Sequence, residues 1–193
     1  MSKKSILLFS FALLLDISCQ QKVDESRKIF HHPQDLFSIS WDSEEWKQST
    51  IVDEILKLPN SSVNLPKYDL ILLNLRNEEL RFNVATQLAY VYGDLRSKNI
   101  RDGFRHSILT YPGAKELYSD TFSINGVLAY RVDYRVSAVH LGYENIKIFC
   151  SVLIVNKDYW HILHASSPIR DNIQSNIDLW KQIHTIVTSF KIS

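Results

Sequence analysis

The chain has 193 residues, 45% of them hydrophobic and 11% aromatic, which suits one buried core and is short for two domains. Its 22 basic and 21 acidic residues nearly cancel, and no block of five like charges occurs, so the electrostatic footprint of a nucleic-acid-binding protein is missing. We therefore expect a single globular domain that does not bind nucleic acid.

The N-terminus has the pattern of an export signal. Lys3 and Lys4 precede the apolar run Ile6 to Leu15, which is too short to cross a bilayer. Asp16-Ile17-Ser18-Cys19 then resembles the lipobox of bacterial lipoproteins, in which the cysteine is lipidated and becomes the mature N-terminus. That family prefers Leu where Asp16 stands here, and the alternative is an ordinary secretory signal cleaved near Ser18. We expect residues 1–18 to be a lipoprotein signal peptide.

Removing that peptide leaves basic and acidic residues in equal number, so attachment to a membrane would rest on acyl chains such as palmitate and not on charge. The polar residues 19–28 predict a flexible tether, followed by one domain over residues 29–193. This organisation places the protein in a bacterial cell envelope, on the periplasmic or cell-surface side. If Cys19 carries lipid, Cys150 has no intrachain partner, and its apolar surroundings in sequence predict a buried hydrophobic residue.

The first half of the domain mixes strand and helix patterns. Alternation over Phe37 to Trp41 predicts a strand, and Ile51 to Leu58 has the spacing of a short helix. A nearly continuous apolar run predicts a strand over Tyr68 to Leu75. Helical spacing predicts the first long helix over Val84 to Ile100. Arg101 to Gly113 suits either a further helical turn or a short strand.

The second half predicts a four-strand antiparallel meander. Leu117 to Ile124 meets Leu128 to Ser137 across Asn125-Gly126, a strong hairpin signal because both central positions of a type I′ turn need positive φ. Ile146 to Val155 and Tyr159 to Ala165 supply the next two strands. The helical periodicity of Asp171 to Ser189 predicts a long closing helix that lies on the sheet. The expected fold class is α+β.

This order of elements resembles the Mog1/PsbP-like family over roughly residues 29 to 192. The matching features are Phe37-Ser38-Ile39, the Asn125-Gly126 hairpin with Tyr130 beyond it, and Tyr159-Trp160-His161-Ile162-Leu163 running into Ala165-Ser166-Ser167-Pro168. The family often has Pro-x-x-Trp after its first strand, a motif that this chain lacks. The resemblance implies an α/β/α sandwich and a role in binding protein partners, since family members bind partners as different as a photosystem complex and a small GTPase.

Catalytic and metal-binding motifs are missing from the sequence, including nucleophile-elbow, zincin, Cys-x-x-Cys and phosphate-loop patterns. His161 and His164 should point to opposite faces of a strand, where they could not chelate one ion together. His31-His32 suits a local hydrogen-bonding pair or solvated side chains. We expect no metal and no cofactor.

Arg131, Asp133 and Arg135 alternate with apolar residues on one predicted strand, so they should share its solvent-facing side. They are either a screened surface row or a partner-docking stripe. The sequence therefore favours a lipid-anchored, non-catalytic module that binds or assembles with an envelope protein of unknown identity. The alternatives are a periplasmic immunity protein against a secreted toxin and an enzyme with an unrecognised site.

Overall fold

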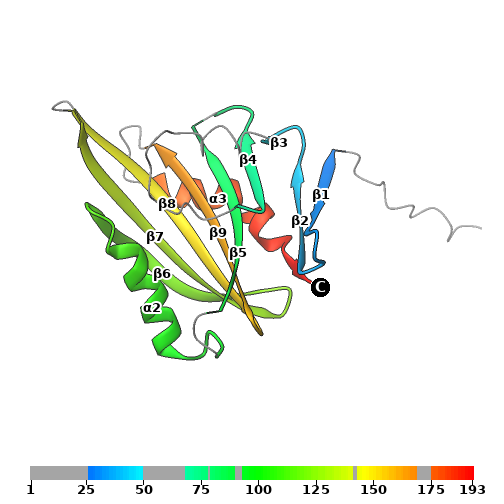
Figure 1. Ribbon diagram of the computed structural model, residues 1–193. Coiled ribbons are helices and arrows are strands. Elements are labelled where there is room, and N and C mark those ends of the chain that lie inside the picture. The colour runs from blue at the N-terminus through cyan, green and yellow to red at the C-terminus, as the bar shows by residue number, and fades with distance from the viewer. Residues whose placement is uncertain (1–25, 50–67, 78, 90–92, 141–142, 169–174) are drawn as a thin grey trace, which may run out of the picture.

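The computed structural model describes residues 26–49, 68–77, 79–89, 93–140, 143–168 and 175–193 (Figure 1). The elements in chain order are β1 (Arg27–His31), β2 (Phe37–Asp42), β3 (Trp46–Gln48), β4 (Leu70–Asn74), β5 (Arg81–Leu88), α2 (Lys98–Leu109), β6 (Ala114–Ile124), β7 (Val127–His140), β8 (Tyr143–Asn156), β9 (Tyr159–Pro168), α3 (Ser175–Thr188) and β10 (Lys191–Ile192). The chain is thus a mixed α+β protein with mostly antiparallel sheet.

The strands form two sheets in which every pair of neighbours is antiparallel. Seven strands are ordered β3-β4-β5-β9-β8-β7-β6, and three others are ordered β1-β2-β10. The turn between β6 and β7 has φ of 48° at Asn125 and 83° at Gly126, which confirms the predicted hairpin. In the strand order of the described residues, β6 lies at one edge of the large sheet.

The two helices of the described residues, α2 and α3, cover opposite faces of the large sheet (Figure 1). On one face, α3 buries Leu179 and Ile183 against a cluster that includes Val152 and Leu163. On the other face, the residues of α2 that pack on the sheet are Ile100, Phe104 and Ile108. Since the middle strands are covered on both sides, the alternation of polar and apolar residues along β7 does not indicate a solvent-exposed face.

The helix predicted over Val84 to Ile100 is wrong. Residues 81–88 form β5, which pairs with β4 on one side and β9 on the other, and the helix begins only at Lys98. Burial along β5 runs exposed, buried, half-buried, buried, buried, which breaks a clean period of two, and Val84 and Leu88 happened to stand at helical spacing. Tertiary pairing decided the conformation of this segment.

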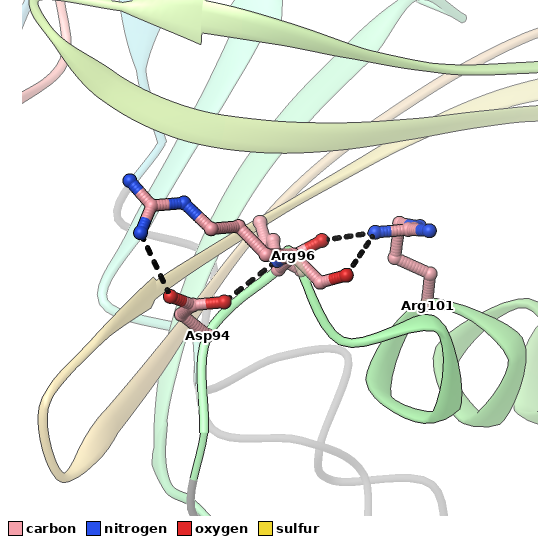
Figure 2. Close-up of polar contacts among 4 residues, drawn as sticks. Asp94, Arg96 and Arg101 are labelled. Atoms are coloured by element: carbon pink, nitrogen blue, oxygen red, sulfur yellow. Dashed lines mark hydrogen bonds and ion pairs between the residues drawn. The ribbon is translucent and has the colours of Figure 1, made fainter.

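The start of α2 is fixed by the loop before it (Figure 2). Asp94 accepts the backbone N–H of Arg96 at 2.7 Å and lies 3.9 Å from its guanidinium. Arg101 of the first helical turn reaches back to the carbonyl oxygens of Leu95 and Arg96, the latter at 3.0 Å. These bonds tie the loop to the first helical turn, where Ser97 makes no side-chain capping bond.

The predicted strands at Phe37 to Trp41 and Tyr68 to Leu75 are present as β2 and β4, and the closing helix is present as α3. The expected helix at Ile51 to Leu58 lies outside the described residues. Three short strands, β1, β3 and β10, were not predicted, and β1 begins inside the expected tether. Each is too short to show a period and depends on a partner elsewhere in the chain.

Candidate protein-binding surface at the edge of the sheet

Arg131 and Asp133 form a buried ion pair on the face of β7 that α3 covers. The Nε of Arg131 donates to Oδ1 of Asp133 at 2.8 Å, and its Nη2 donates to Oδ2. The Asp133 residue is fully buried, and the Arg131 side chain is 11% exposed. The expectation that these side chains share a solvent-facing row is therefore incorrect, because a helix that is distant in sequence covers them. A bidentate pair of hydrogen bonds of this kind fixes the position of the guanidinium.

The guanidinium of Arg131 lies between two aromatic rings. Its Cζ is 3.9 Å from the ring centre of Trp180 on α3 and 5.1 Å from that of Tyr118 on β6. Phe122 meets Trp180 edge-on at 5.5 Å. Cations over aromatic faces are attracted by the ring quadrupole. The Tyr118–Arg131–Trp180 stack thus joins three elements, and it leads from a buried carboxylate outward to Tyr118, which is 43% exposed.

Cys150 lies beside this stack as the cross-strand neighbour of Asp133. Burial raises the pKa of the thiol well above its usual value, and the charge of Asp133 raises it further. A thiol that stays protonated in an apolar site is a poor nucleophile. Cys150 is 1% exposed and free, which confirms the predicted buried hydrophobic residue.

A β-bulge puts Glu116 and Tyr118, which would share a face in a regular strand, on opposite faces of β6. The register against β7 shifts between Glu116 and Tyr118, which leaves Leu117 as an extra residue that is 43% exposed. Before the bulge, Glu116 faces α2 and accepts a hydrogen bond at 2.6 Å from Arg105. This bond lowers the pKa of the Glu116 carboxyl. Beyond the bulge, Tyr118 faces α3.

Arg135, the third residue of the predicted stripe, lies farther along β7. It is half-buried and is the cross-strand neighbour of Lys115 on β6 and of buried Ile148 on β8. Lys115 and Arg135 therefore put two like charges opposite one another on the α3 face. Within the described part of the chain, neither has an ion pair.

His161 is fully buried where the two sheets meet. Its ring packs against Phe37 and Phe190 at 5.4 Å each, and its Nδ1 is 3.0 Å from the hydroxyl of Thr86. Burial, with a smaller contribution from nearby His32, lowers the pKa of His161 to about 4. The imidazole is neutral at neutral pH and contributes to packing.

His164 lies on the opposite face, as its odd spacing from His161 predicted. Its Nδ1 is 2.8 Å from the hydroxyl of Ser151, and its ring stacks on Phe149 at 5.4 Å. Burial lowers the pKa of His164 to about 4 and is the main cause that raises the pKa of nearby Tyr134 to about 12. Ser151 is itself buried, so this serine–histidine contact is enclosed in the sheet.

Of the predicted His31-His32 pair, His31 is exposed and His32 is buried. The Nε2 of His32 lies 3.5 Å from Asp69, and its Nδ1 accepts the backbone N–H of Gln34 at 3.2 Å. The pair is therefore split, with one member joining the lead-in of β2 to the start of β4. Among the described residues, no three His, Cys, Asp or Glu side chains are grouped closely enough to hold a metal ion.

Two surface hollows differ in chemistry. One, of about 270 Å³, lies between the β6–β7 turn and the C-terminal segment and is lined by apolar side chains together with Asn125 and Lys191. The other, of about 460 Å³, lies between the β4–β5 turn and α3 and contains Glu45, Arg76 and Lys181 among polar neighbours. Neither hollow combines a nucleophile with a neighbouring base. In the described part of the chain, neither helix has the length and apolarity needed to span a bilayer.

Comparison with models of known families finds no match, and no curated protein sequence matches the chain. Solved structures do match. PsbP of the cyanobacterium Synechocystis (CyanoP) superposes with a TM-score of 0.53 at 11% identity, covering 91% of this chain and 98% of that one. A protein from Bacteroides thetaiotaomicron superposes with a TM-score of 0.52 at 8% identity, covering 86% of this chain but only 48% of its own length. The chain therefore has a PsbP-like α+β fold.

Proposed function

We propose that this chain is a bacterial cell-envelope protein, anchored by lipid on Cys19, whose domain binds a protein partner and catalyses no reaction. The lipobox-like sequence before Cys19 supports the anchor. The domain itself supports the binding role through the edge of its large sheet.

The Tyr118–Arg131–Trp180 stack is the observation that carries this proposal. Tyr, Arg and Trp are the residue types that contribute most to the energy of protein interfaces. Here Arg131 is held by the buried carboxylate of Asp133, and the rings of Tyr118 and Trp180 pack against its guanidinium. Little side-chain entropy would therefore be lost on binding. Tyr118 and Leu117 lie at the end of this rigid unit, both 43% exposed and adjacent on an edge strand.

The non-catalytic assignment is supported by where the acid–base groups lie. Catalysis needs such groups to converge in a cleft with a pKa near the working pH. His161 and His164 instead lie on opposite faces, the first buried and the second half-buried, and each has a pKa lowered to about 4. The buried Arg131–Asp133 pair is covered by Trp180 and positions the aromatic stack.

Site-specific photo-crosslinking of the anchored, full-length protein in cells tests the proposal. A photoreactive phenylalanine analogue replaces Leu117 in one variant and Lys47, on the opposite edge strand β3, in a control. We expect a discrete protein adduct from position 117 and none from position 47, and we expect Tyr118→Ala to reduce it. Equal adducts at both edges, or none at position 117, would contradict a binding role for this edge.

A further inference from the structure

The outer side of β6 has the backbone groups to pair with another strand. Within the described residues, β6 pairs with β7 alone, so alternate N–H and C=O groups face outward. One of them is capped locally, since the N–H of Thr121 donates to the carboxylate of Asp120 at 2.7 Å. Asp120 also accepts the hydroxyl of Tyr118 at 3.0 Å. Both contacts lie at the surface, where an incoming strand could replace them.

The edge strand β6 carries a positive and a negative side chain at two separate points. Lys115 faces the α3 side together with Arg135, and these two cations lack an acidic partner among the described residues. Asp120 is exposed on the same side of the same strand. Opposite charges stabilise when they face each other across paired strands, and like charges destabilise. An acidic side chain brought opposite Lys115 would therefore relieve its repulsion with Arg135.

The bulge sets which residue would arrive there if the incoming strand were a second β6. In an antiparallel pair with a twofold axis, one residue must face its own copy. With Tyr118 facing Tyr118, and with the extra Leu117 omitted from the count on each strand, Ser119 faces Glu116 and Asp120 faces Lys115. The twofold axis repeats this Asp120–Lys115 pair on the other side. Without the bulge, Asp120 would face Glu116 and repel it.

We propose that the partner at this edge is a second copy of the chain, joined through antiparallel pairing of two β6 strands about Tyr118. This rests on the proposed function, because it names the occupant of the same surface. The dimer makes one continuous sheet, sets the two Tyr118 rings side by side, and closes two Lys115–Asp120 ion pairs. Asp120 exchanges its local contact with the Thr121 N–H for the cations of the other copy.

Disulfide trapping in cells tests the twofold axis. In the anchored, full-length protein, Tyr118→Cys gives each copy one cysteine at the twofold axis, with the two Cα atoms about 5 Å apart. A disulfide can form across that Cα–Cα distance. Thr121→Cys is the control, since its two copies would lie roughly 20 Å apart at about 3.3 Å per residue. Cys150 is buried and does not compete. We expect an oxidised homodimer from position 118 and none from position 121.

Charge reversal tests the register. Lys115→Glu alone and Asp120→Lys alone should each weaken dimerisation at least tenfold in sedimentation of the detergent-solubilised full chain. An equimolar mixture of the two variants should restore it, because opposite charges then meet at both places: one ion pair keeps its original order and the other is reversed. Both residues are exposed, and circular dichroism checks that each variant folds.

Failure of the mixture to recover, or equal trapping at positions 118 and 121, would overturn the dimer. A crosslink from position 117 to a different protein would also overturn it, while leaving the proposed binding function in place. Loss of every crosslink from position 117 would remove both proposals.

Discussion

Replacing Asp133 with Ala should destabilise the domain by about 3 to 5 kcal/mol, because it leaves a buried cation without its counter-ion. Asp133 is fully buried and the Arg131 side chain is 11% exposed, so water cannot take over the lost contacts. The double variant Arg131→Met with Asp133→Leu removes both charges together and should cost much less. Glu116→Ala breaks a pair of the same chemistry whose side chains are 45% and 21% exposed, and it should cost less than about 1 kcal/mol.

Urea unfolding at pH 7, followed by far-UV circular dichroism, measures these differences. With a slope of about 2 kcal/mol per molar urea, a loss of 4 kcal/mol lowers the midpoint by about 2 M. The Glu116→Ala midpoint should move by less than about 0.5 M on the same scale. A loss below about 1 kcal/mol for Asp133→Ala, or a double variant as unstable as the single one, would refute the reasoning that burial makes this pair indispensable once formed.

Three further predictions concern acid, backbone strain and anchoring. The free energy of unfolding should be highest above pH 6.5 and fall as the pH drops towards 4, because His161 and His164 have a pKa of about 4 in the folded state and 6.5 in the unfolded state. Urea midpoints that stay constant from about pH 7 to pH 4 would contradict this. Gly113→Ala should lower the melting temperature and Gly103→Ala should not, since a Cβ at 113 would lie 2.2 Å from a backbone oxygen at φ +78° while position 103 is open. Cys19→Ala should move the protein from the membrane to the soluble fraction and abolish fatty-acid labelling, and an unchanged distribution would exclude a lipid anchor there.

Local signals in the sequence were sufficient for the hairpin of β6 and β7. Asn125-Gly126 specifies its turn because few other residue pairs tolerate two positive φ values, and the strands beside it follow from that turn. The segment from Val84 to Ile100 could not be assigned in the same way. Its strand β5 is stabilised by β9, more than seventy residues later, and no local pattern reports that pairing.

The candidate site shows the same division. Arg131 and Asp133 were identified by residue type, but their environment was misjudged because Trp180, which covers Arg131, comes from the last helix. Tyr118 was not singled out at all. Its exposure depends on the bulge at Leu117 and on β6 being an edge strand, and neither property is visible in a single strand's alternation. The polar pattern located the surface, and the tertiary structure decided which of its residues reach solvent.

The small sheet joins segments from the two ends of the domain, and this has a consequence for folding during synthesis. β2 lies between β1 and β10, and the hydroxyl of Ser189 bonds both the N–H and the C=O of Ser40 (2.8 and 2.9 Å), 149 residues away. Figure 1 shows the C-terminal segment beside β2. Contacts of such long range form late and slow a folding reaction. A chain that emerges N-terminus first during synthesis therefore leaves β2 without its last neighbour until β10 has also been made, and the small sheet stays incomplete until then.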